Sequence, residues 1–212
     1  SGAHGLAAAG VVALALAAPG LTARLSAHEA PRALAAAAQP APAVGSFLLA
    51  RRDLPDPNFF ETVVLLLAYD EESGAVGVVV NRRSDVRVGQ AFEEGGPLAE
   101  REDDLYLGGP VAVESMIVLL RDEEPPAGSL RIVDDVFMVD GNTDLEGLLL
   151  GEPAASSVRF YAGYAGWSPG QLEDEISRGV WHVTTARPGW VFSERPEEAW
   201  QELIRILLGP RA

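Results

Sequence analysis

The sequence predicts an α+β domain with a mixed or antiparallel sheet. Short apolar or alternating runs, each typical of a strand, recur between residues 45 and 194. Only a few segments carry helical signals, and no strand–helix–strand rhythm repeats along the chain. Because no internal repeat is visible, we expect these runs to form a single domain.

The first three strands are expected at 45–50, 62–70 and 74–81, which read "GSFLLA", "TVVLLLAYD" and "GAVGVVVN". The second run is apolar over most of its length, which is typical of a strand buried on both faces. Two prolines and two aspartates before it provide turn chemistry. The short turn "DEESG" after it predicts that the second and third strands form a hairpin.

The rest of the chain alternates between short strands and a few helices. Further strands are expected at 105–110, 116–121, 130–133, 136–140, 157–164, 180–186 and 190–194. Helices are expected at 88–94, at 142–151 with a Thr143–Glu146 capping box, at 169–178 with Gly179 ending it, and from Pro196 to Leu208. The last helix is amphipathic, because Ala199, Trp200, Leu203, Ile204 and Leu207 share one face.

The stretch "GWSPG" spells the G-x-S-x-G of a serine-hydrolase nucleophile elbow. In such an elbow the residue after the nucleophile donates its backbone N–H to the oxyanion hole, and Pro169 has no N–H. A base is also missing, because His182 lies in an alternating strand pattern rather than a loop. We therefore interpret Ser168 as a helix N-cap, with Pro169 as the first helical residue and Gln171 completing a capping box. No catalytic residue is predicted.

Composition limits the partners that the protein can have. The net charge is −15, and all 16 basic residues are arginines. Because the arginines form no stripe, the sequence argues against a DNA-binding surface. The absence of cysteine excludes disulfides, zinc–thiolate sites and cysteine nucleophiles. We expect a protein or small-molecule partner instead of nucleic acid.

Residues 1–43 form an alanine- and proline-rich leader that differs from the rest of the chain. Its apolar run, 5–18, is too short for a transmembrane helix but has the length of a signal-peptide core. No arginine or lysine precedes this run, so a signal remnant and a flexible extension are both open. We expect a single folded domain over 44–212 and a cytoplasmic location, or export if the run is a signal.

Two stretches imitate metal or phosphate sites without meeting their requirements. "DGNTDLE" begins at Asp140 like a calcium loop, but Leu145 and Gly151 stand where that loop needs glycine and glutamate. "LGGP" at 107–110 lacks the lysine and the following helix of a phosphate-binding loop. We therefore expect neither a metal nor a cofactor.

Several polar or aromatic residues lie at strand ends beside glycines, where ligand clefts tend to form. These candidate binding residues are Asn81, Arg82, Gly108, Gly109, Tyr164, Trp167 and Gln171. The alternative is structural. Asn81 and Gln171 would then satisfy buried backbone groups, and Trp167 would belong to the core.

Three segments carry a resemblance to a known family. They are "LLARRDLPDPNFFETVVLLLAYDEESGAVGVVVNR" at 48–82, "LYLGGPV" at 105–111 and "YAGYAGWSPGQLEDEISRGVW" at 161–181. In this order and spacing the chain resembles the bacterial YqgE/AlgH family over residues 45–208, and "GYAGWSPGQLEDEI" is the most specific part. Arg83 and Tyr69 depart from the proline and histidine that the family often has there.

The resemblance implies an α+β fold with a bifurcated, mostly antiparallel sheet curled into a pseudo-barrel with flanking helices. It implies no firm activity, since members are described as uncharacterised or, from genetic effects, as transcriptional regulators. Our leading hypothesis is a non-enzymatic regulatory or binding protein that uses the candidate residues. One rival is an enzyme using a cleft near Asn81, Gly108 and Trp167, with His182 or Glu175 as acid–base. Another is a partner-binding module that uses the C-terminal helix or the leader.

Overall fold

The computed structural model describes residues 39–91, 98–124, 128–139 and 157–209, which belong to one compact unit of the chain. The leader, the predicted helix at 142–151 and the loop that begins at Asp140 lie outside the described residues. The described residues confirm an α+β fold, in which a mostly antiparallel sheet curls into a half-barrel flanked by a few helices.

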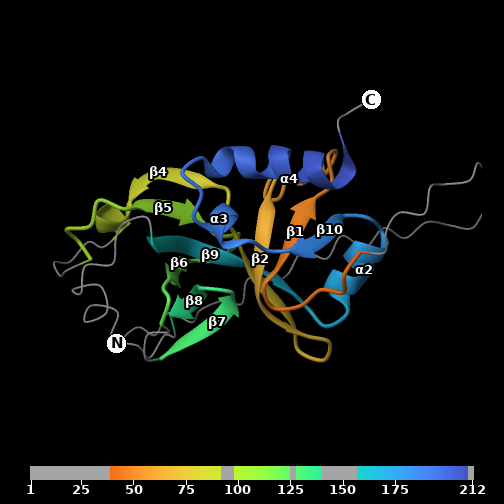
Figure 1. Cartoon of the computed structure of the whole chain (residues 1–212), viewed down its shortest axis with the longest axis horizontal. Coiled ribbons are helices and arrows are strands. Elements are labelled where there is room, and N and C mark those ends of the chain that lie inside the picture. Colours follow the sequence, from red (N-terminus) through yellow and green to blue (C-terminus); the bar gives the residue numbers. More distant parts are fainter. Residues whose placement is uncertain (1–38, 92–97, 125–127, 140–156, 210–212) are drawn as a thin grey trace, which may run out of the picture. The chain divides into compact units, whose positions relative to one another are not determined.

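The elements follow one another along the chain as Figure 1 labels them. The strands are β1 (Ser46–Ala50), β2 (Val63–Asp70), β3 (Gly74–Val79), β4 (Arg83–Arg87), β5 (Asp104–Leu107), β6 (Val111–Arg121), β7 (Ser129–Val133), β8 (Val136–Val139), β9 (Val158–Trp167) and β10 (Trp181–Thr185). The helices are α2 (Gln171–Ser177), α3 (Pro188–Val191) and α4 (Ala199–Leu208), with 3₁₀ turns η1 (Val88–Ala91) and η3 (Pro196–Glu198).

The sheet has the strand order β10-β1-β2-β3-β9-β6-β8-β7, with β4 and β5 branching from β9. All pairs are antiparallel except β5 with β9. The predicted β2–β3 hairpin is confirmed, with Asp70 opposite Gly74. Figure 1 shows α4 running across the ends of β1 and β2, while α2 lies beside β10.

The sheet divides along β9, so the bifurcation implied by the resemblance is present. One edge of β9 pairs with β6 from Val158 to Tyr164. The other edge pairs first with β5, over Phe160–Ala162, and then with β3, over Ala165–Trp167. Gly163 lies between these two segments with φ 68°, a conformation that glycine adopts without strain.

Three buried clusters form the core and lie on both faces of the curled sheet. The largest joins side chains of eight strands to α3 and α4, and includes Phe47, Leu65, Tyr106, Tyr161, Trp200 and Ile204. A second packs the other face of β1, β2 and β10 against α2 through Leu172, Trp167 and Trp181. A third cluster, around Val88, Leu105 and Phe160, lies on the face of β9 opposite to the largest cluster. Alternation along β1 and β2 supplies the first two clusters, so both faces of these strands are buried.

Glycines at the end of β5 allow two backbones to approach closely. A Cβ on Gly108 would lie 2.3 Å from the carbonyl oxygen of Gly163, and one on Gly109 would lie 2.2 Å from the carbonyl carbon and oxygen of Tyr164. Real Cβ atoms do not come this close to backbone. Both glycines are therefore required where the chain crosses β9 between β5 and β6.

The predicted elements differ from the structure at a few places. The sequence predicts a strand at 190–194, but Pro188 starts the short helix α3, and Val191 and Phe192 are both buried where a strand would alternate. The C-terminal helix begins with a 3₁₀ turn, and Leu207 is 40% exposed rather than buried, beside exposed Ile206. β4 was not predicted, because its polar sequence "RSDVR" has no apolar face.

Candidate functional site

The carboxylate of Glu175 is the centre of the segment that carries the family resemblance. Its Oε2 accepts hydrogen bonds from the indole Nε1–H groups of Trp167, at 2.9 Å, and Trp181, at 2.7 Å. Its Oε1 accepts one from Nε2 of Gln171 at 2.9 Å. The two indoles pack edge to face with centroids 6.0 Å apart. This carboxylate therefore joins β9, α2 and β10.

The N-cap interpretation of Ser168 is wrong. Gly170, with φ 76°, occupies the N-cap position and α2 begins at Gln171, so the Ser168 hydroxyl lies too early in the chain to reach the first helical N–H groups. One of the two hydrogen bonds of the expected capping box is present, because Oε1 of Gln171 accepts a hydrogen bond from the backbone N–H of Ser168 at 3.0 Å. Pro169 precedes the helix and is not its first residue.

The end of α2 matches the sequence prediction. Gly179 has φ 70° and its N–H donates to the carbonyl of Ile176, while the N–H of Val180 donates to the carbonyl of Glu175. This pair of bonds is a Schellman motif, in which a left-handed residue ends the helix.

We expect the substitution Ser168→Ala to change the free energy of unfolding by less than about 0.5 kcal/mol, the usual range for a surface position. Ser168 is exposed, and the backbone N–H that contacts Gln171 remains in alanine. Urea denaturation of the two proteins tests this. A loss near 1 kcal/mol, typical of an N-cap, would contradict the position of the helix start.

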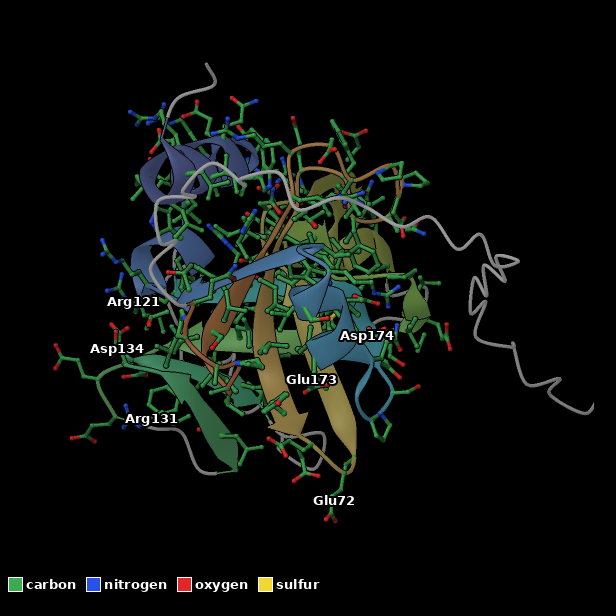
Figure 2. The ribbon with its side chains drawn as sticks, turned by 90° about the vertical axis from the view of Figure 1, so that its right-hand side faces the viewer. Glu72, Arg121, Arg131, Asp134, Glu173 and Asp174 are labelled. Carbon is green, nitrogen blue, oxygen red and sulfur yellow. The ribbon has the colours of Figure 1, made fainter. Side chains whose placement is uncertain are left out.

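A second contact ties α2 to β2. The hydroxyl of Tyr69 donates to Oε1 of Glu173 at 2.6 Å, and this hydrogen bond, with burial and nearby carboxylates, raises the pKa of Tyr69 to about 12. Figure 2 shows Glu173 and Asp174 on α2, on the side that faces the viewer. Asp174 is exposed there and pairs with Arg178.

Trp167 and Asn81 head two groups of candidate binding residues at opposite ends of β3, while Gly109 lies against the backbone of Tyr164 on β9. Trp167 is paired with Ala75 at the start of β3, and Asn81 follows its end, so the two are about 20 Å apart along the strand. Gly108 belongs to the second group, because its carbonyl accepts the N–H of Val79. Trp167 and Asn81 therefore do not meet at one point, and binding by the candidate residues stays a prediction.

The polar groups of the second group contact backbone. Asn81 is buried, and its amide accepts from Val63 N at 2.8 Å and donates to Glu61 O at 2.9 Å. Arg82 donates to the carbonyl of Asn58 at 2.8 Å, and burial lowers the pKa of its guanidinium. These contacts favour the structural alternative for Asn81.

His182 lies within β10 opposite Leu49, as its strand pattern predicts. Burial, together with the positive charge of Arg52, lowers the pKa of His182 below its ordinary value of 6.5. The folded protein therefore holds this imidazole neutral at a pH where the unfolded chain already binds a proton.

This shift predicts a pH dependence. The unfolded state takes up the proton first as the pH falls through 6.5, so the stability that His182 contributes is present above that pH and lost below it. We expect His182→Gln to flatten the fall in unfolding free energy between about pH 7 and 5.5. Denaturant titrations at several pH values test this, and equal slopes in both proteins would contradict the assignment.

A cavity of about 520 Å³ lies where α3 and α4 meet, and we call it the α3–α4 cavity. Its lining consists of Arg187, Gly189, Trp190, Ser193, Arg195, Glu198 and Glu202. Within the described part of the chain, the guanidinium of Arg187, the carboxylate of Glu202 and the indole N–H of Trp190 have no hydrogen-bond or ion-pair partner. Arg195 is paired with Glu198 at 2.7 Å.

Arginines from the sheet hold the wall of this cavity in place. Arg159 stacks on the ring of Tyr106, 5.1 Å from its centroid, and donates to the carbonyl of Ser193 at 3.2 Å. Arg83 donates to the carbonyl of Glu194 at 2.8 Å. The hydroxyls of Tyr106 and Tyr161 are buried in the main core, against which Trp190 packs. Burial raises the pKa of both phenols, so they stay protonated.

Sequence reasoning missed the α3–α4 cavity. Trp190 and Ser193 of its lining lie in the run 190–194, for which the sequence predicts a strand, and no motif connects Arg187 with Glu202. The only available signal was Pro188, a common first residue of a helix. No group of three or more metal-ligating side chains occurs in the residues that the structure describes. None of the described helices is both long and apolar enough to cross a bilayer.

Comparison with known proteins identifies the family. A family model described as AlgH-like matches residues 47–211. The chain belongs to the AlgH-like family. It is 41% identical over 174 residues to a UPF0301 protein of Streptomyces coelicolor, which covers 79% of this chain and 88% of that protein. A UPF0301 protein of Chlorobaculum tepidum is 35% identical, over 76% of this chain and 84% of its own length.

Two solved structures are similar to this chain in fold. The crystal structure of a protein from Corynebacterium diphtheriae matches with a TM-score of 0.67 at 28% identity, over 81% of this chain and 90% of that one. The solution structure of the AlgH protein from Pseudomonas aeruginosa matches with a TM-score of 0.64 at 28% identity, over 82% and 94%. The resemblance inferred from the three sequence segments is thus confirmed. The names of these relatives state no activity, so they assign none to the chain.

Proposed function

We propose that this AlgH-like protein is a non-enzymatic binding protein whose ligand is a small molecule held in the α3–α4 cavity. One observation carries the proposal. The cavity presents the ring of Trp190 beside two opposite charges, on Arg187 and Glu202, that have no hydrogen-bond or ion-pair partner among the described residues. Its volume of about 520 Å³ lies within the range of small-molecule sites.

The cavity is also built in advance of binding. Trp190 packs against the main core, and the backbone beside it is fixed by Arg159 and Arg83 through the carbonyls of Ser193 and Glu194. A preformed wall reduces the ordering cost that a ligand must overcome. This arrangement supports a binding role for the α3–α4 segment.

The contacts of residues 163–176, which we call the family-specific segment, support a structural role for this segment. Both carboxylate oxygens of Glu175 accept hydrogen bonds from side chains that pack in the fold. Trp167 and Trp181 are nearly fully buried. An acid–base group needs free access to substrate, so these contacts weigh against Glu175 in the enzyme hypothesis. His182 does not line the cavity either.

A regulatory role would then act through ligand binding rather than direct DNA contact. The net charge of −15 opposes the approach of a polyanion. In the cavity itself two arginines are balanced by two glutamates, so no local basic surface compensates. This supports a small-molecule signal as the input of any regulation.

Titration with 8-anilinonaphthalene-1-sulfonate, an aromatic sulfonate, tests the proposal. We expect saturable binding through ring contact with Trp190 and charge contact with Arg187. Arg187→Gln should weaken it about tenfold, the effect of one lost charge-assisted hydrogen bond. Arg205→Gln on α4 is the matched control, since Arg205 is exposed and outside the cavity. Equal affinity in the wild type and the Arg187 variant would contradict the proposed site.

A further inference from the structure

We propose that the α3–α4 cavity selects a zwitterion with an apolar body, the chemistry of a free amino acid or a short peptide. This inference rests on the proposed function and names the ligand class. It follows from how the four charges of the lining are distributed. Arg195 and Glu198 form an ion pair at 2.7 Å, which leaves Arg187 and Glu202 as one cation and one anion without a partner among the described residues.

Arg187 is suited to the carboxylate of such a ligand. It stands at the N-cap position of α3 in an extended conformation, and its carbonyl accepts the N–H of Trp190. The backbone is therefore fixed while the exposed guanidinium is free to bind. A planar guanidinium can hold a carboxylate through two parallel hydrogen bonds.

Glu202 decides between a zwitterion and a simple anion. It lies in the first turn of α4, partly buried, with no partner among the described residues. An anionic ligand would bring a further negative charge into a cavity that already contains Glu202 and Glu198, and like charges repel. An ammonium group on the ligand removes this repulsion and pairs with Glu202. A purely cationic ligand would meet the same penalty from Arg187.

Trp190 provides the contact for the apolar body. Its ring is half-buried against the core, so one part is fixed by packing and another part is open to the cavity. Apolar and aromatic groups gain most when they bury against such a rigid ring. The net charge of the lining is zero, which matches a ligand without net charge.

A congeneric series of probes tests the inference by isothermal titration calorimetry. L-Phenylalanine carries both charges, 2-phenylethylamine only the ammonium and 3-phenylpropionate only the carboxylate. We expect L-phenylalanine to bind at least tenfold more tightly than either single-charge analogue. Glycyl-L-phenylalanine, run in parallel, distinguishes a peptide site from a free amino acid site by which of the two zwitterions binds more tightly.

Variants separate this inference from the proposed function. Glu202→Gln should weaken L-phenylalanine about tenfold and leave 3-phenylpropionate unchanged or slightly tighter, with Gln201→Glu as an exposed control on the same helix. The zwitterion inference is overturned if 3-phenylpropionate binds as tightly as L-phenylalanine. It is also overturned if neither zwitterion binds while the aromatic sulfonate does. In both cases the proposed binding function of the α3–α4 cavity is retained. If the aromatic sulfonate does not bind either, both the zwitterion inference and the proposed function are contradicted.

Discussion

Glu175→Ala is expected to lower the free energy of unfolding by about 3 kcal/mol, because it leaves two buried indole N–H groups without an acceptor. Trp181 is 1% exposed and Trp167 is 7% exposed, so both indoles are fixed by the packing around them. The lost hydrogen bond from Gln171 adds to this effect. Urea denaturation followed by circular dichroism measures the change.

Two further variants show whether the carboxylate itself is responsible. Glu175→Gln keeps the size of the side chain, and its amide oxygen can still accept from the indoles, so we expect a smaller loss. Glu173→Ala, two positions earlier on α2, removes one contact with Tyr69 and leaves the indoles bonded. A loss below about 1 kcal/mol in Glu175→Ala, or an equal loss in Glu173→Ala, would show that the indole contacts do not hold the fold together.

Gly109→Ala is expected to destabilise the domain by roughly 3 kcal/mol or more, since overpacking against backbone cannot be relieved by a change of rotamer. The added Cβ would lie 2.2 Å from the carbonyl carbon and oxygen of Tyr164 and 2.5 Å from the nitrogen of Ala165. The crossing from β5 to β6 would have to move away from β9, where the sheet divides. Thermal and urea unfolding both measure the loss.

Two other glycines separate the effect of space from that of backbone conformation. A Cβ at Gly170 meets nothing within 4 Å, but φ is 76°, so Gly170→Ala should cost only about 1 kcal/mol of conformational strain. A Cβ at Gly189 in α3 also meets nothing within 4 Å and needs no positive φ, so Gly189→Ala should be neutral or stabilising. Equal losses at Gly109 and Gly170 would contradict the close approach at β9.

The sequence predicted those elements whose local pattern and tertiary environment agree. Residues 63–67 of β2, the valines Val78 and Val79 of β3 and the face of α4 that includes Ala199, Trp200, Leu203 and Ile204 are apolar and buried. Gly179 likewise ends α2 as a local signal should. In contrast, β4 is polar and forms because it pairs with β5, a partner that its own residues do not specify.

The candidate site was less predictable because it depends on contacts between distant segments. Ser168 and Gln171 have the spacing of a capping box, but Gly170 adopts φ 76° and delays the helix start. The sequence offers Glu175 as an acid–base group in the enzyme hypothesis. Its role as acceptor for Trp167 and Trp181 is not visible there, because it depends on β9 and β10 flanking α2. The cavity residues Arg187 and Glu202 are brought together only by the packing of α3 and α4 on the sheet.

Indole N–H signals in a ¹⁵N-resolved NMR spectrum test the central claim most directly, because the four tryptophans report on different places. Trp167 and Trp181 donate to Glu175, and Trp200 donates to the carbonyl of Ala50 at 2.8 Å. Trp190 lines the α3–α4 cavity with its indole N–H free of described partners. On titration with 8-anilinonaphthalene-1-sulfonate, the Trp190 signal should move progressively to saturation while the other three stay in place. Movement of the Trp167 and Trp181 signals without that of Trp190 would contradict the account and locate the site at the family-specific segment instead.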